Sequence, residues 1–369
     1  MAVNPFTPTF GVTPPLLVGR HDEIDDFRGA LEEGVGSPER VTLVTGLRGT
    51  GKTVMLNAYE DVARSEGWLI ISETAGRGML ERITNTAIPE LLRLVDPDQA
   101  RSRVTGVGVA GVSVQRQVTE TNAPEPNFRY RMNQLLDAIS VDTGVLITVD
   151  EIHRSDDMEL LGSTIQHLRR EGRNVAFVGA GLPRSVHELL SSERPTTFLR
   201  RADRRHLGAV RGEDVREALL VPIEEAGKRI DTDALSIAVE GTQGYPFMIQ
   251  LVGREIWRAS AGESITAAEA KRGIDRARRK IGQLVHEPAL ADLSAMDRSF
   301  LVAMAQDEEG PSRMYDIAQR LDVTSGYASQ YRLRLINAEI IQEAGHGSVD
   351  FTIPYLREYL RDHAASSVR

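Results

Sequence analysis

A glycine-rich segment in the first sixth of the chain has the residue types needed to bind a phosphate. Residues 46–53 read GLRGTGKT and fit the pattern G-x-x-x-x-G-K-[ST] at every fixed position. Glycines let backbone N–H groups turn toward a phosphate, the Lys52 ammonium suits the β- and γ-phosphates, and the Thr53 hydroxyl is a ligand for Mg²⁺. We therefore expect a nucleoside triphosphate site, with a chance lysine in a βα turn as the alternative. The expected phosphate-binding residues are Gly46, Leu47, Arg48, Gly49, Thr50, Gly51, Lys52, Thr53 and Val54.

Two adjacent acids follow a second apolar segment, VLITV at 145–149. Asp150 is expected to hold the Mg²⁺ ion through its water shell, and Glu151 to act as general base toward the attacking water. Two acids that merely cap a strand are the alternative. Because ligands of open parallel sheets bind at the carboxyl ends of the strands, both acids are expected beside the phosphates.

The elements that must position these residues are two buried strands and a helix. Residues 41–45, VTLVT, are apolar and β-branched, which is typical of a parallel strand, and an amphipathic helix follows Lys52. The predicted fold class is therefore α/β, with a parallel-sheet core.

Composition limits the other possibilities. The 369 residues include 53 acids and 44 bases, a net charge of −9, and no cysteine, which excludes disulfides and thiolate chemistry. No apolar run approaches the roughly 20 residues of a membrane span, and no export signal is recognised at the start. We expect a cytoplasmic protein of two or three domains with no membrane contact.

These motifs resemble those of AAA+ P-loop ATPases, most closely the archaeal-ATPase and origin-initiator branch that borders on the STAND signalling ATPases. The resemblance implies ATP and Mg²⁺ as ligands, hydrolysis of ATP to ADP, and assembly into a homo-oligomer. It also implies that the segment PPLLVGR at 14–20 lies against the adenine through Val18 and Gly19, although a cap that packs on the sheet is the alternative. The predicted domains are a nucleotide-binding core at 1–211, a helical lid at 212–288 and a winged-helix domain at 289–369.

The sequence departs from the family where a polar sensor residue should follow the next strand. Residues 175–179, VAFVG, run into Ala180-Gly181-Leu182-Pro183, and Asn174 stands at the wrong end of the strand. We therefore expect slow hydrolysis and a conformational role for bound nucleotide. A nucleotide-binding scaffold without useful turnover is the extreme form of this interpretation.

Two further groups of residues are implied by the same resemblance. An arginine finger that acts on a neighbouring subunit is expected between 198 and 207, with Arg201 preferred over Arg204 and Arg205, although a solvated helix end is an equally good interpretation. In the lid, Gly244-Tyr245-Pro246-Phe247 resembles a second sensor, which would place Pro246 and Arg254 near the nucleotide. A plain helix-start turn is the alternative there.

The region 101–127 contains a glycine-rich alternating stretch, 104–114, which predicts a hairpin or loop of unassigned role. From about residue 290, three helices, two strands around Gly345-His346-Gly347 and a closing helix predict a winged helix-turn-helix. Its third helix offers Tyr327, Arg332 and Arg334 as DNA contacts. However, residues 290–369 hold twelve acids and eight bases, which is unusual for a DNA-binding domain.

The densest basic segment lies in the lid instead. It contains Lys271, Arg272, Arg276, Arg278, Arg279 and Lys280, opposed by Asp275 alone. A solvated face is the simplest interpretation, and contact with DNA or an acidic partner is the alternative. Taken together, these motifs favour an ATP-dependent switch or assembly factor that acts on duplex DNA. A STAND-like signalling or defence ATPase whose winged helix binds protein is the second possibility.

Overall fold

The computed structural model describes residues 3–9, 11–95, 127–191, 195–291 and 293–363, so the predicted hairpin at 104–114 lies outside the described residues. By its contacts the chain divides into two compact units, which we treat separately. The sheet unit consists of Arg20–Gly46 and Lys52–Leu207. The helical unit consists of Met1–Gly19, Leu47–Gly51 and Gly208–Arg369.

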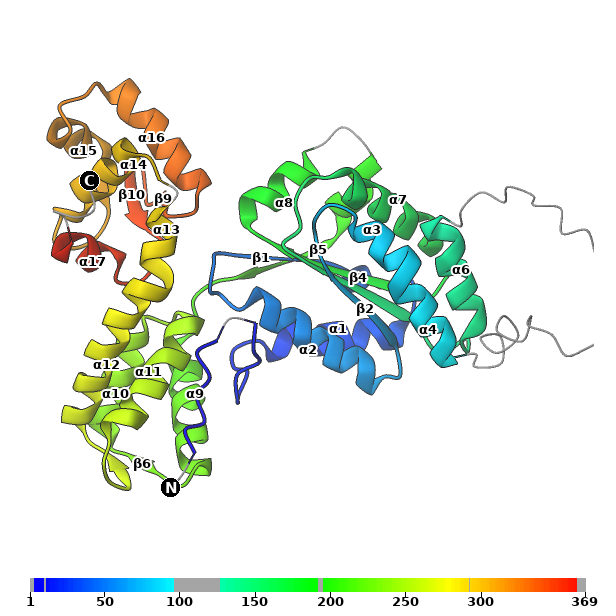
Figure 1. Cartoon of the computed structure of the whole chain (residues 1–369), viewed down its shortest axis with the longest axis horizontal. Coiled ribbons are helices and arrows are strands. Elements are labelled where there is room, and N and C mark those ends of the chain that lie inside the picture. The colour runs from blue at the N-terminus through cyan, green and yellow to red at the C-terminus, as the bar shows by residue number, and fades with distance from the viewer. Residues whose placement is uncertain (1–2, 10, 96–126, 192–194, 292, 364–369) are drawn as a thin grey trace, which may run out of the picture. The chain divides into compact units, whose positions relative to one another are not determined.

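The sheet unit is built on five parallel strands in the order β2-β3-β4-β1-β5 (Figure 1). The strand β4 therefore separates β1 from β3. Residues of β3 alternate between the two faces: Val145, Ile147 and Val149 belong to one core, and Leu146 to the other. The α/β fold class predicted from the apolar segments is confirmed. The strands are β1 Val41–Gly46, β2 Leu69–Thr74, β3 Val145–Asp150, β4 Val175–Gly181 and β5 Asp203–Leu207.

Helices cover both faces of this sheet (Figure 1). One face packs against α1 His21–Glu33 and α2 Lys52–Ser65. The other packs against α3 Met79–Arg82, α4 Ile88–Val95, α6 Phe128–Ala138, α7 Asp156–Arg170 and α8 Pro183–Leu190. The described residues of this unit also form three short helical turns: η1 Pro38–Arg40, η2 Ile83–Ala87 and η3 Pro195–Arg201. The inner strands β1, β3 and β4 are thus buried on both faces, as their nearly continuous apolar sequences predict.

The helical unit begins with the predicted lid. Phe6 and Val18 from the N-terminal segment are buried in the same apolar core as the lid helices, and Asn4 donates to the Arg254 carbonyl at 3.2 Å. The lid helices are α9 Gly212–Glu225, α10 Thr232–Thr242, α11 Pro246–Ala259 and α12 Ala267–Ile281, with a two-stranded pair β6 Arg229–Ile230 and β7 Ser264–Ile265.

The C-terminal part of the helical unit has the predicted helices and hairpin, and one strand more. The strand β8 pairs with β10 in a small antiparallel sheet of order β8-β10-β9, and a strand of two residues is too short to show in a sequence pattern. The elements are α13 Glu287–Ala291, α14 Ala295–Ala305, β8 Ser312–Arg313, α15 Met314–Arg320, α16 Ser325–Asn337, β9 Ile341–Glu343, β10 Ser348–Phe351 and α17 Leu356–Asp362. No described helix has both the length and the apolar character to cross a membrane.

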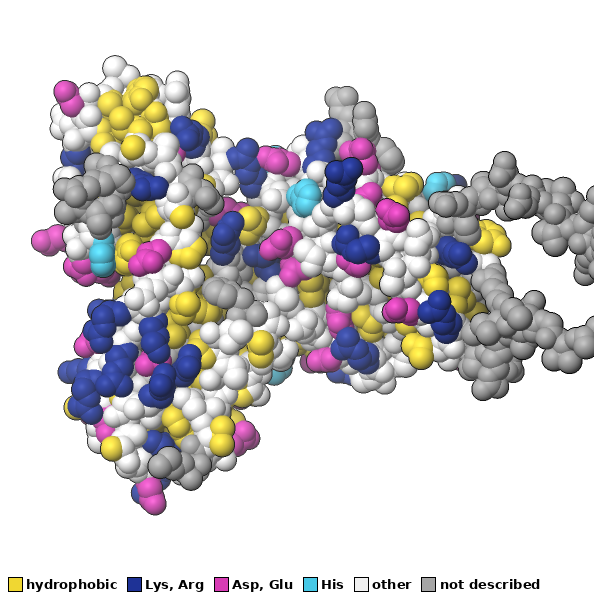
Figure 2. Space-filling model, viewed as in Figure 1, with side chains coloured by type: hydrophobic (Ala, Val, Ile, Leu, Met, Phe, Trp, Pro, Cys, Tyr) yellow, Lys and Arg dark blue, Asp and Glu magenta, His cyan; other side chains and the backbone are white. Residues whose placement is uncertain are grey.

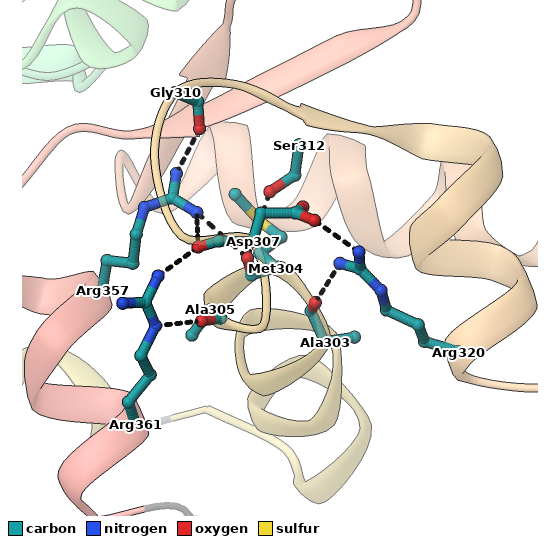
Figure 3. Close-up of polar contacts among 9 residues, drawn as sticks. All are labelled: Ala303, Met304, Ala305, Asp307, Gly310, Ser312, Arg320, Arg357 and Arg361. Carbon is teal, nitrogen blue, oxygen red and sulfur yellow. Dashed lines mark hydrogen bonds and ion pairs between the residues drawn. The ribbon is translucent and has the colours of Figure 1, made fainter.

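Three arginines hold the C-terminal end of α14 in place (Figure 3). Arg357 donates to the carbonyls of Met304 and Gly310 at 3.0 and 2.6 Å, Arg361 donates to Ala305 at 2.6 Å, and Arg320 donates to Ala303 at 2.7 Å. The last carbonyls of a helix lack partners within the helix and form the negative end of its dipole. These guanidinium groups satisfy both needs, so this part of the fold uses its positive charges internally.

The lid joins the C-terminal part through a π-helical turn, Gly282–His286 (η4), between α12 and α13. The His286 ring is fully buried, its Nε2 lies 2.8 Å from the Pro354 carbonyl, and its edge faces Tyr359 at a centroid distance of 5.0 Å. Within the described chain Nδ1 has no hydrogen-bond partner. Burial therefore lowers the pKa of His286 to about 4.

Because the folded-state pKa of His286 lies below its ordinary value of 6.5, folding favours the neutral ring, and stability should decrease as the pH falls from 6.5 toward 4. A shift of this size corresponds to about 3 kcal/mol at most. We expect urea unfolding to show a smaller loss of stability between pH 7 and pH 4.5 in His286→Gln than in the wild type. Equal slopes in the two proteins would remove His286 from the acid response.

Candidate functional site

The carboxyl edge of the sheet brings together the start of α2 and the end of β3. The Thr53 Oγ1 hydroxyl donates to Asp150 Oδ2 at 2.5 Å, and the Lys52 ammonium donates to the Gly46 carbonyl at 2.8 Å. The first contact joins residues 97 positions apart in the sequence, and together the two contacts place four of the predicted site residues at one edge. A hydroxyl and a carboxylate oxygen in contact are the hard oxygen ligands that suit Mg²⁺, so the donor set fits the expected ion.

A polar hollow of about 290 Å³ borders this contact within the sheet unit. Besides Thr53 and Asp150 it is lined by residues that the sequence analysis did not single out: Leu56, Asn57, Glu60, Ser72, Glu73 and Thr74. Thr74 is the register partner of Asp150 on the neighbouring strand, and Glu60 accepts a hydrogen bond from Thr148 at 2.6 Å. The polar residues at the end of β2 could be recognised in the sequence as candidates for this site. Only the strand order shows that they lie beside Asp150.

Glu151 adopts a left-handed backbone conformation with φ 55°, which is uncommon for a residue with a side chain. Its N–H donates to Asp150 Oδ1 at 2.8 Å, and the next residue, Ile152, donates to the Ala180 carbonyl at 2.8 Å. These bonds turn the chain sharply at the strand end and leave the Glu151 side chain exposed. His153 lies 3.0 Å from the Glu151 carbonyl, so its described contact is with the backbone of the turn.

The end of β4 explains why a polar sensor is absent. A Cβ atom at Gly179 would stand 2.9 Å from the Ile152 side chain, and one at Gly181 would stand 2.8 Å from the Ile152 carbonyl. Ala180, between them, is buried in the core shared with α2. Asn174 lies just before β4, and its side-chain oxygen accepts a hydrogen bond from the buried Arg40 at 2.5 Å. The strand therefore offers space only for small residues at the end that the sensor should occupy.

Residues Leu47–Gly51 of the glycine loop belong to the helical unit, where they meet Tyr245. The Tyr245 hydroxyl donates to the Arg48 carbonyl at 2.5 Å. A Cβ atom at Gly49 would stand 2.1 Å from the Tyr245 hydroxyl oxygen. Gly49 also has φ +75°, whereas Gly51, with φ +93°, faces open space. Tyr245 belongs to the motif 244–247 that resembles a second sensor, but nothing in its sequence context marks a partner 197 positions away.

The other residues predicted to contact nucleotide are distributed over the helical unit. Val18 is buried in the apolar core, and Gly19 has φ +65° beside Asp214. Pro246 is the first residue of α11, as its fixed φ suits, and Arg254 is half-buried two turns later. The structure thus gives the burial and backbone conformation of these residues. Their contacts with nucleotide stay predictions.

The arginines between 198 and 207 differ in how firmly they are held. Arg205 forms ion pairs with Asp203 and with Asp26, the latter at 3.0 Å. Arg204 is exposed and donates weakly to the Arg200 carbonyl at 3.4 Å. Arg201 is exposed at the end of η3. A finger must leave its own subunit, so the ion pairs of Arg205 make it the least suitable of the three.

The three predicted DNA contacts lie on α16, as expected, and each has a contact within the fold. Arg332 pairs with Glu343 at 2.6 Å, and Arg334 pairs with the buried Asp297 at 2.9 Å. The Tyr327 hydroxyl lies 2.9 Å from that of Tyr331. Both positive charges of this helix are thus partly neutralised by acids of the same domain.

The two loop glycines allow a matched test of the Tyr245 contact. Gly49→Ala combines left-handed strain with a clash against the hydroxyl, whereas Gly51→Ala adds the strain alone. We expect Gly49→Ala to lower the free energy of unfolding in urea by about 1–3 kcal/mol more than Gly51→Ala. Adding Tyr245→Ala should recover part of that difference. Equal costs for the two glycines would show that Tyr245 does not restrain the loop.

Comparison with known proteins agrees with this geometry. Residues 16–178 match the AAA ATPase domain family, and residues 283–360 match a domain of unknown function, DUF8462. No curated protein sequence matches the chain. The Walker-type ATPase PABY2304 of Pyrococcus abyssi aligns over 94% of this chain and 96% of its own, with a TM-score of 0.62 and 16% identity. The ORC2 protein of Aeropyrum pernix, in ADPNP and ADP complexes, aligns over 97% and 98%, with a TM-score of 0.58 and 13% identity. The chain therefore has the fold of P-loop AAA+ ATPases, and its residues 16–178 are similar to the AAA ATPase domain family.

Proposed function

We propose that this protein binds Mg-ATP at the glycine loop and hydrolyses it slowly, so that the bound nucleotide acts as a conformational switch. The observation that carries the proposal is the contact between Thr53 and Asp150, beside Lys52 and at the carboxyl edge of the parallel sheet. Neither a plain βα turn nor a simple strand cap requires a hydroxyl, a carboxylate and an ammonium at one edge.

Each residue has a distinct role in this proposal. The Lys52 ammonium exchanges the Gly46 carbonyl for the β- and γ-phosphates, and Thr53 and Asp150 hold the magnesium ion and its water. Magnesium, when bound, neutralises charge that develops on the phosphate oxygens. Glu151 accepts the proton of the attacking water at its carboxylate. Val18, Gly19, Pro246 and Arg254 contact the rest of the nucleotide.

The proposed slow turnover follows from the end of β4, where Ile152 leaves space only for small residues. Without a polar side chain at Gly179, Ala180 or Gly181, the site lacks one hydrogen bond to the γ-phosphate, and such bonds to charged groups contribute about 1.5–3 kcal/mol. We propose that a second subunit supplies part of the deficit through Arg201, in a homo-oligomer formed on duplex DNA. A protein partner in a STAND-like signalling role is the second candidate, favoured by the ion pairs of Arg332 and Arg334.

The test of the nucleotide site uses two variants. Lys52→Ala should weaken ATP binding by about 10- to 100-fold in calorimetry, because it removes a charged phosphate contact. Glu151→Gln should keep ATP binding and any nucleotide-dependent oligomer but lower turnover by about 10²- to 10⁴-fold. If Mg-ATP gives no binding heat with the folded wild type, the proposal fails. Unchanged turnover in Glu151→Gln would exclude Glu151 as the base.

The finger is tested by mixing two inactive proteins. Arg201→Ala should lose about 10³-fold in turnover while it still binds ATP, since a finger acts only on the transition state. Lys52→Ala retains Arg201 but binds ATP too weakly to be loaded at the ATP concentration of the assay. An equimolar mixture should regain measurable turnover if the arginine acts in trans, whereas Arg204→Ala should need no such partner. A mixture as inactive as its components, or a fully active Arg201→Ala, would contradict the role of Arg201.

A further inference from the structure

The lid helix α12 presents positive charge on one side and apolar side chains on the other. Thr266 and Glu269 form a capping box that fixes its start. Gly273 lets α12 approach α11 closely, since a Cβ atom there would stand 2.6 Å from the Ile256 backbone nitrogen. The packed residues of α12 are Ala270, Gly273, Ile274, Ala277 and Ile281, all buried. This packing determines which side of the helix faces solvent.

The exposed side of α12 carries what we call the basic stripe: Lys271, Arg272, Arg276, Arg278 and Arg279. Figure 2 shows a dense group of Lys and Arg side chains at the place where Figure 1 shows α12. One acid, Asp275, lies on the same side of the helix, and Glu240 of α10 lines a hollow with Lys271 and Arg278. At 1.5 Å per residue the stripe is roughly 12 Å long, enough to span several phosphates of a duplex.

These bases are bound less firmly within the fold than the arginines of the C-terminal domain. Arg272 stands 4.0 Å from Glu269 at the limit of an ion pair, with 56% of its side chain exposed. Arg278 lies over the Tyr355 ring at 4.4 Å, a contact with an uncharged partner. By contrast, Arg320, Arg332, Arg334 and Arg357 each pair with a carboxylate of their own domain.

We propose that the basic stripe of α12, rather than α16, is the surface that binds the phosphate backbone of nucleic acid. The proposal rests on the proposed function for its class of partner, and on the structure for its position. A chain with net charge −9 repels a polyanion over most of its surface, so binding needs a local concentration of free bases. Guanidinium groups match phosphate in a planar, bidentate geometry, and the stripe has four of them.

The test measures binding of a fluorescein-labelled 30-base-pair duplex by anisotropy as salt is raised from about 50 to about 300 mM. The variant Arg272→Gln/Arg276→Gln/Arg279→Gln removes three exposed charges without touching the packed side. We expect affinity to fall at least about 10-fold and the slope of log K against log salt to decrease by about 2–3, since each phosphate contact contributes about 0.9.

Matched controls make the result specific. Arg211→Gln/Arg216→Gln/Arg229→Gln removes the same charge from exposed positions of the helical unit outside α12, and should change affinity less than about twofold. Arg332→Gln should leave the salt slope unchanged. Equal losses in both triple variants, loss with Arg332→Gln, or no duplex binding by the wild type would each overturn the proposal. So would displacement of the duplex by poly-glutamate at equal charge, which would indicate an acidic protein partner.

Nucleotide binding separates this proposal from the proposed function. The stripe variant should bind Mg-ATP in calorimetry as the wild type does, because none of its three positions belongs to the nucleotide site. A protein that binds ATP but no duplex would refute the stripe alone. A protein that binds duplex through the stripe but gives no heat with ATP would refute the switch alone.

Discussion

The hydrogen bond between Thr53 and Asp150 joins the helix that follows β1 to the end of β3, across the position of the strand between them. β1 and β3 are not neighbours in the sheet, because β4 lies between them. The hydroxyl at the start of α2 and the carboxylate at the end of β3 must therefore meet past the end of β4, which reads Gly179-Ala180-Gly181. Ile152 then folds back onto the two glycines. This close packing of Ile152 leaves no room for a sensor side chain at the end of β4.

The strands β1, β3 and β4 of the sheet were the predictable part of this molecule. Each predicted strand of the core is a short apolar run that ends in a glycine or an acid, and burial on both faces produces that pattern directly. The identity of the residues around Asp150 was not predictable in the same way. Ser72, Glu73 and Thr74 end β2, but nothing in their sequence says that β2 rather than β4 or β5 is the outer neighbour of β3. Strand order is a property of the packed sheet, and local patterns do not carry it.

Polar contacts between residues far apart in the sequence were the other feature that could not be predicted. Tyr245 binds the Arg48 carbonyl, and Arg40 is buried with hydrogen bonds to the Ala30 carbonyl and to Asn174. In each case the sequence shows an ordinary tyrosine or arginine near a turn. Burial of the arginine is reflected in a pKa lowered to about 10, chiefly by desolvation. Such residues become recognisable only when the fold brings a carbonyl or amide to them, which explains why the sequence analysis assigned them no role.

The C-terminal helices show why an arrangement of helices and a hairpin does not by itself indicate DNA reading. A guanidinium that caps α14 or pairs with Asp297 would have to give up a bond with an ideal partner before it could contact a phosphate. The exchange gains little, because one charged hydrogen bond replaces another and the buried Asp297 is left without its ion pair. The basic side of α12 has no such cost, since its bases are already solvated or stacked. The preference for α12 thus follows from the difference in free energy between a free and an engaged guanidinium, and not from the number of arginines in either helix.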